Sequence, residues 1–133
     1  MDKVFHIDVY TPTGKYLSTD ADFLKVKSPL SVLGILPNHA PLITTLEISK
    51  MLIRSGGQDV NYAISGGVMN IKKDHSVVLM LDAVESAEEI DLERAMNAKR
   101  RAEERLASKE EVDVTRAKAA LSRALNRISV KQI

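Results

Sequence analysis

The sequence of 133 residues contains no cysteine, which excludes a disulfide framework, a zinc–thiolate site and a cysteine nucleophile. It also has no long apolar run, since the charge-free segment Ser28 to Pro37 contains two prolines and is far too short to cross a bilayer. Charged residues are scattered through the first thirty positions, so no apolar leader is expected. We therefore expect a soluble chain with no direct membrane insertion.

The two halves of the chain lack different residue types. Every glycine, proline and aromatic residue lies at or before Gly67, whereas seven of the eight arginines lie at or after Arg94. No side-chain carboxylate follows Asp113, yet five cations do: Arg116, Lys118, Arg123, Arg127 and Lys131. The last segment therefore has no counter-charges of its own, and we expect it to meet an anionic partner. The formal net charge of only +1 argues against a dedicated nucleic-acid binder.

Short strands separated by turn signals are predicted from Val4 to about Leu81. Apolar Phe5, Ile7 and Val9 alternate with polar neighbours, as in a strand with one buried face. The further predicted strands cover residues 23–27, 42–46, 48–54, 60–64, 68–71 and 77–81, with a hairpin turn at 56–57 and a break at 66–67. This spacing is typical of an antiparallel β-sandwich, which we assign to residues 1–84.

A two-helix hairpin is predicted for residues 85–133, which makes the fold class α+β. Ser86 and Glu89 form a capping box that predicts a first helix over about 87–107. Asp113 restarts an apolar stripe that predicts a second helix over about 112–130, with a short connection at 108–111. Neither helix is long enough to be stable alone in water. The hairpin can therefore fold onto the sandwich or lie along another protein, which suits a switch.

Arginines gather on one face of each predicted helix. Their spacing allows a closed hairpin to bring guanidinium groups together beside a carboxylate, from Asp91, Arg94 and Arg101 on the first helix and Arg116, Arg123 and Arg127 on the second. Guanidinium groups suit phosphate oxygens because they form paired, charge-assisted hydrogen bonds. The cluster therefore predicts a nucleotide bound without a glycine-rich phosphate loop.

Two other interpretations of these arginines remain open. They can grip an acidic protein surface, or they can form a solvated helix face with pairs such as Lys99–Glu103 and Arg100–Glu104. The tail has no aromatic residue for base stacking, which disfavours a nucleic-acid-binding hairpin. No nucleophile with a neighbouring base and no metal-ligand spacing is present in the sequence, so we predict neither a catalytic nor a metal site.

Four stretches in the same order resemble the epsilon subunit family of bacterial F-type ATP synthases. They are Gly34-Ile35-Leu36-Pro37-Asn38-His39-Ala40-Pro41-Leu42, Ser65-Gly66-Gly67, Ile90-Asp91-Leu92-Glu93-Arg94-Ala95 and the ending Arg123 to Val130. The resemblance covers nearly the whole chain. Where the family often has Gly-Glu, Ser31-Val32-Leu33 precede Gly34, so one implied contact to the membrane ring is missing.

The resemblance implies a non-catalytic central-stalk subunit that couples rotation of the membrane-embedded c-ring to catalysis. The implied partners are the gamma subunit, the c-ring and, when the hairpin extends and inhibits ATP hydrolysis, the alpha/beta catalytic head. The implied location is the cytoplasmic face of the bacterial cell membrane, as a peripheral protein. No cofactor is required, and ATP is implied as a regulatory ligand that holds the hairpin compact.

The same resemblance assigns roles to individual residues. The positions implied for ATP binding are Glu85, Ile90, Asp91, Arg94, Ala95, Arg101, Arg123 and Arg127. The positions implied for partner contacts are His39, Arg116, Arg123 and Arg127. The alternative to this nucleotide-regulated subunit is a ligand-free adaptor whose basic helix grips an acidic partner.

Overall fold

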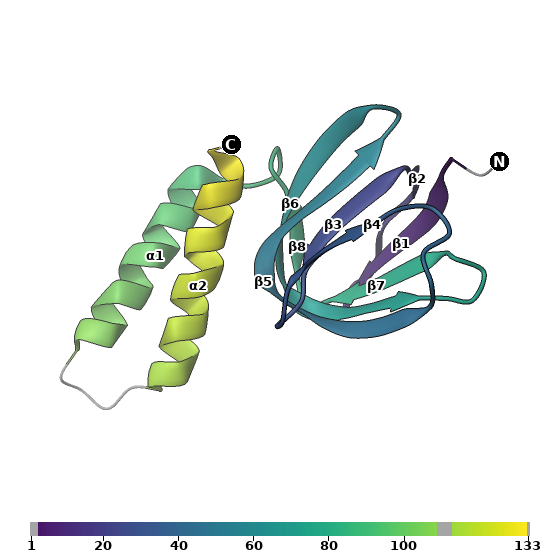
Figure 1. The fold of residues 1–133 in the computed structure, drawn as a ribbon. Coiled ribbons are helices and arrows are strands. Elements are labelled where there is room, and N and C mark those ends of the chain that lie inside the picture. Colours follow the sequence, from purple (N-terminus) through teal and green to yellow (C-terminus); the bar gives the residue numbers. More distant parts are fainter. Residues whose placement is uncertain (1–2, 109–112, 133) are drawn as a thin grey trace.

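The structure, a computed structural model, describes residues 3–108 and 113–132. Within them the chain forms strands and then two helices (Figure 1). The strands are β1 (Phe5–Thr11), β2 (Gly14–Ala21), β3 (Phe23–Lys27), β4 (Val32–Ile35), β5 (Leu42–Ser55), β6 (Gln58–Ile71), β7 (Val77–Leu81) and β8 (Val84–Ser86). The helices are α1 (Leu92–Ala107) and α2 (Val114–Lys131). A β-sandwich followed by a helical hairpin confirms the predicted fold class.

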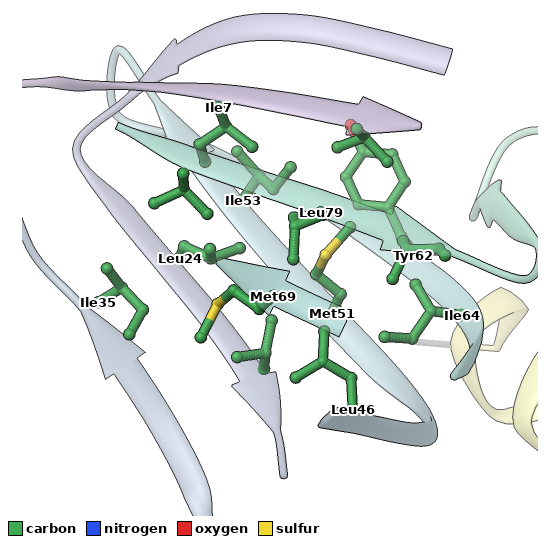
Figure 2. Packing of buried hydrophobic residues seen from close by; sticks show 14 of the residues in the cluster. Ile7, Leu24, Ile35, Leu46, Met51, Ile53, Tyr62, Ile64, Met69 and Leu79 are labelled. Carbon is green, nitrogen blue, oxygen red and sulfur yellow. The ribbon is translucent and has the colours of Figure 1, made fainter. Parts of the chain in front are cut away.

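The strands pair in the order β2-β1-β7-β6-β5-β3-β4, and β8 pairs with β6. All neighbours are antiparallel except β1 and β7, which are parallel. In β1 the predicted alternation is confirmed, since Phe5, Ile7 and Val9 are buried while His6 is exposed. The sandwich core lies between the folded layers (Figure 2), and its largest fully buried side chains include Ile7, Leu24, Met51, Met69 and Leu79.

Two long strands replace the shorter ones predicted in the middle of the chain. The predicted segments 42–46 and 48–54 are joined in β5, and β6 runs through Gly66 and Gly67 without a break. Pairing passes from Leu46↔Gly67 to Ile48↔Ser65, which leaves one unmatched residue on each strand. The predicted break is therefore wrong, because positive φ values at the two glycines bend the strand instead of ending it. The predicted hairpin turn at Gly56–Gly57 is confirmed, with positive φ at both residues.

The edge strands β2 and β4 were not predicted. Most of β2 is exposed or half-buried, so its side chains show little alternation between apolar and polar residues. Only four residues form β4, and Gly34 interrupts them. Asn38, in the loop that follows, has a φ of 66°, a left-handed conformation that asparagine tolerates better than most residues.

The first helix begins at Leu92, five residues after its predicted start at 87. The Ser86–Glu89 capping hydrogen bonds do form, but they close a turn, and Asp91 then caps the helix by accepting from the backbone N–H of Arg94. Asp113 caps α2, as its predicted restart requires. The predicted start at 112 and residues 109–111 of the predicted connection 108–111 lie outside the described residues. The predicted domain boundary after residue 84 falls within β8.

The second helix lies between the first helix and the sandwich (Figure 1). Four buried alanines let the two helices pack closely: Ala95, Ala102, Ala117 and Ala124. On its other side, the fully buried Val130 joins a small apolar cluster with Ala63 and Ile90. The amide of Asn126 donates to the backbone oxygens of Ser49 at 2.7 Å and Ile64 at 3.4 Å. Few apolar side chains therefore hold the hairpin on the sandwich. Neither described helix has the length and apolar character needed to cross a membrane.

Candidate anion-binding cleft between sandwich and hairpin

A cleft of about 260 Å³ lies where the hairpin leaves the sandwich. Strand β8 and the turn after it supply one wall, the start of α1 supplies another, and the end of α2 closes it. Its lining residues are Glu85, Glu89, Asp91, Arg94, Ala95, Ala98, Arg101 and Arg127. We call this the hairpin cleft. It contains three carboxylates and three guanidinium groups, so its chemistry depends on which of these groups are already paired.

The two sides of the hairpin cleft are joined by an ion pair. The Nε of Arg127, on α2, donates to Oε1 of Glu85, on β8, at 2.5 Å. The two side chains are 29% and 36% exposed, so water and salt screen the pair. The pair spans 42 residues of sequence. It forms only when α2 lies against the sandwich.

The first helix and its cap contribute a fixed carboxylate and two available cations. Oδ1 of Asp91 accepts from the backbone N–H of Arg94 at 3.1 Å, so this side chain is committed to capping the helix. The guanidinium groups of Arg94 and Arg101 have no hydrogen-bond or ion-pair partner among residues 3–108 and 113–132. Both residues are exposed.

Glu89 is held at the rim by a tyrosine from a distant strand. The hydroxyl of Tyr16, on β2, donates to Oε1 of Glu89, which also accepts from the backbone N–H of Ser86 at 2.9 Å. The bond from Tyr16, followed by the one from Ser86, lowers the pKa of Glu89. Burial, with the bond to Glu89 as the next cause, raises the pKa of Tyr16. Glu89 is thus ionised and Tyr16 protonated at neutral pH.

The three carboxylates and three guanidinium groups of the hairpin cleft balance in formal charge, but the two kinds of group differ in how many partners they already have. Each carboxylate accepts a hydrogen bond from the protein. The guanidinium groups of Arg94 and Arg101, in contrast, form no hydrogen bond or ion pair within the described part of the chain. An anion with several oxygens is the ligand that such groups recognise best. Ligand pockets usually measure about 300–1,000 Å³, so this cleft matches the phosphate part of a nucleotide better than a whole enclosed nucleotide. Arg127 would meet that anion while still paired with Glu85.

Six of the eight predicted ATP-binding positions line the cleft: Glu85, Asp91, Arg94, Ala95, Arg101 and Arg127. Ile90 is buried beneath it, 3% exposed, in the apolar cluster under α2. Arg123 is not among the lining residues, although it lies one turn before Arg127 on α2. ATP binding itself stays a prediction.

Two of the residues predicted to contact partners, His39 and Arg116, lie on different parts of the fold. His39 is in the loop between β4 and β5. Its ring Nδ1 lies 2.7 Å from the backbone oxygen of Ala40, and its backbone oxygen lies 3.0 Å from Nδ1 of His75. Arg116 is exposed in the first turn of α2. These two residues therefore belong to different surfaces. Their contacts with partners stay predictions.

Some features of the cleft were missed or wrongly predicted. Glu89 and Ala98 were not assigned to the site, although Ala98 follows Ala95 at helical spacing and was thus detectable. The Tyr16 contact joins residues 73 positions apart and leaves no local signal. Among the described residues the predicted Lys99–Glu103 and Arg100–Glu104 pairs do not form, since Arg100 instead donates to Oδ1 of Asn97 at 2.8 Å.

Comparison with protein families divides the chain as the fold does. Residues 4–86 match the beta-sandwich domain of the ATP synthase delta/epsilon chain, and residues 88–132 match the long alpha-helix domain of the same family. A solved chain of the Euglena gracilis mitochondrial ATP synthase, described as OSCP/F1/c-ring in rotational state 1, has a TM-score of 0.80 at 19% identity. The match covers 92% of this chain and 78% of that one, and it supports the fold alone.

Curated relatives are similar over most of their length. The ATP synthase epsilon chain of Pelotomaculum thermopropionicum is 46% identical over 106 residues, which are 80% of this chain and 78% of the relative. The ATP synthase epsilon chain of Bacillus subtilis is 40% identical over 106 residues, or 80% of each chain. The chain therefore belongs to the ATP synthase delta/epsilon family, as an epsilon-type subunit of a bacterial F-type ATP synthase that is not an enzyme by itself.

Proposed function

We propose that this subunit acts in the central stalk, couples rotation of the c-ring to catalysis, and inhibits ATP hydrolysis when its hairpin extends, with ATP holding the hairpin compact. The observation that carries this proposal is the hairpin cleft, which brings guanidinium groups from both helices to the base of the sandwich. A ligand bound there would contact both helices and β8 at once. It would be lost when the hairpin leaves the sandwich.

The small size of the docking contact supports a reversible hairpin. Its apolar part consists of Val130, Ala63 and Ile90 with Ala87 beside them, whereas the sandwich core contains many more buried side chains. A polar contact from Lys131 Nζ to the backbone oxygen of Ala87, 3.0 Å long, adds to the docking. Releasing α2 would thus leave the sandwich core intact.

ATP would favour the compact form by binding it selectively. A ligand shifts a conformational equilibrium only by its difference in affinity between the two forms. Micromolar affinity needs about 8 kcal/mol, and charge-assisted hydrogen bonds contribute about 1.5–3 kcal/mol each. Contacts from Arg94, Arg101 and Arg127 to phosphate oxygens are enough to reach this range before the cost of ordering the ligand.

In the extended form, the cations of α2 would meet acidic residues of the alpha/beta catalytic head. Arg116 is exposed in the compact form and Arg123 half-buried, and neither forms an ion pair within the described part of the chain. His39, in the β4–β5 loop, lies on the sandwich and would serve contacts to the gamma subunit or the c-ring. In this proposal the subunit lies peripherally at the cytoplasmic face of the cell membrane. The alternative function, a ligand-free adaptor, would use the same cations of α2 to bind an acidic partner but would not require the hairpin cleft.

Calorimetric titration of the full chain with ATP, with and without magnesium, tests the proposal. We expect saturable binding that Arg94→Ala and Arg127→Ala each weaken more than tenfold. Arg100→Ala is the matched control, because Arg100 is exposed on α1 but does not line the cleft. Absence of binding up to millimolar ATP would reject nucleotide regulation and leave the adaptor as the function of the hairpin.

A further inference from the structure

The carboxylates of the hairpin cleft differ in where their partners come from. Glu85 accepts from the Nε of Arg127 at 2.5 Å, and Asp91 accepts from the backbone N–H of Arg94 at 3.1 Å. Both donors belong to the hairpin and line the cleft themselves. These two carboxylates are thus neutralised or fixed by the same element that the ligand would touch.

Glu89 depends instead on the sandwich. Its Oε1 accepts from Ser86 N–H at 2.9 Å and from the hydroxyl of Tyr16, on the edge strand β2. The ring of Tyr16 meets the ring of Tyr62 edge to face, with centroids 6.3 Å apart and planes at 82°. Tyr62 is a buried core residue, 7% exposed. The hydroxyl that reaches Glu89 is therefore held by the sandwich core, which keeps its position fixed.

We propose that Tyr16 is a positioning residue for the hairpin cleft, because its hydroxyl holds the charge of Glu89 at the rim. With that bond in place, Glu89 is directed to its own turn at Ser86. The guanidinium groups of Arg94 and Arg101 then stay available to a bound polyphosphate. This inference rests on the proposed ATP binding and names a residue outside the hairpin that sets its strength.

Without the hydroxyl of Tyr16, Glu89 would compete with the bound phosphate for the guanidinium groups of the cleft. A nearby opposite charge stabilises an ionised carboxylate, so Glu89 without this hydrogen bond would pair with an available cation of the cleft. In this cleft the available cations are the guanidinium groups that would bind phosphate. A pairing of Glu89 with Arg94 or Arg101 would occupy a phosphate-binding group and would also repel the ligand. The effect requires the negative charge of Glu89, which separates it from a loss of packing.

The experiment titrates ATP by calorimetry into the full chain and into Tyr16→Phe, Glu89→Gln and the double variant. Tyr10→Phe is the matched control, because Tyr10 is a half-buried tyrosine on β1 that lies outside the cleft. We expect Tyr16→Phe to weaken ATP binding about fivefold, an effect of the size of one ordinary hydrogen bond. In the Glu89→Gln background the same change should alter affinity by less than about twofold. Urea denaturation of each variant checks that the fold is kept.

Three results would overturn the inference in distinguishable ways. Wild-type affinity in Tyr16→Phe, with weakened binding in Arg94→Ala, would remove the role of Tyr16 and leave the proposed function intact. Equal weakening by Tyr16→Phe with and without the Glu89 charge would show that the tyrosine acts through packing alone. Failure of the wild-type chain to bind ATP would reject the proposed function and this inference with it.

Discussion

Truncation of Val130 should release the hairpin from the sandwich. Val130 is fully buried against Ala63 and Ile90, and Val130→Ala removes two methyl groups worth about 0.8 kcal/mol each, plus a cavity term. The loss is thus about 2 kcal/mol. The polar docking contacts of Asn126 and Arg127 add about 1 kcal/mol and about 0.5 kcal/mol. Removing about 2 kcal/mol from the docking free energy shifts the docking equilibrium roughly 30-fold.

The absence of native cysteine makes this shift directly measurable. Cysteines introduced at the exposed positions Lys50, on β5, and Ser122, on α2, carry spin labels without any background site. We expect one distance population in the parent chain and a second, longer population in Val130→Ala. Val114→Ala is the matched control, since Val114 lies on the same helix and is 49% exposed.

The reasoning would be refuted by an unchanged distance distribution in Val130→Ala accompanied by a fall of about 2 kcal/mol in the free energy of unfolding. In that case the hairpin and the sandwich unfold as one unit, and the small docking contact does not act as a separable joint. Equal release by Val114→Ala would refute it as well, because that side chain buries little surface.

The remaining predictions concern the sandwich and the docking contact. Gly67→Ala should destabilise the chain by about 4 kcal/mol or prevent folding, because a Cβ there would lie 2.2 Å from the backbone oxygen of Met80. Gly57 has open space around it, so Gly57→Ala should lower the free energy of unfolding by only about 1–2 kcal/mol. Urea denaturation measures both changes. The pKa of His6 is raised mainly by its hydrogen bond to Asp20, so its stabilising effect is complete below the unfolded pKa of about 6.5 and is lost as pH rises through the folded pKa. In an NMR titration Asp20→Asn should therefore move the midpoint of His6 down toward that value, and an unmoved midpoint would contradict the assignment. Finally, Asn126→Ala should increase amide hydrogen exchange in α2 without a matching increase in the core strands, and equal increases in both would argue against independent release of the hairpin.

Local signals were enough to predict the elements whose pattern is set by one burial face or one turn. The alternation around Phe5, the two-glycine hairpin turn and the Asp113 cap all act through neighbouring residues. The start of α1 was harder, because Ser86 and Asp91 both offer capping side chains. The first closes a turn beside the sandwich, and only the second begins the helix.

The candidate site was only partly predictable for the same reason. Helical spacing placed Arg94 and Arg101 on one face, and the structure finds both lining the cleft. The same spacing also placed Arg123 in the cluster, but Arg123 does not line the cleft. The contact from Tyr16 to Glu89 depends on how β2 lies beside the hairpin. No periodicity within either segment encodes that contact.

The hydrogen bonds of Asn126 have a consequence for how the hairpin can move. Its amide reaches the oxygens of Ser49 and Ile64, which face each other across one rung of the β5–β6 ladder. A slide of α2 by a single helical turn, about 5.4 Å, would carry the amide beyond both oxygens. The sandwich therefore offers the helix a single docking position and not a series of positions along the sheet. If the hairpin moves as proposed above, it is therefore either docked or released, and its signal to the rotor would have two positions rather than a graded range.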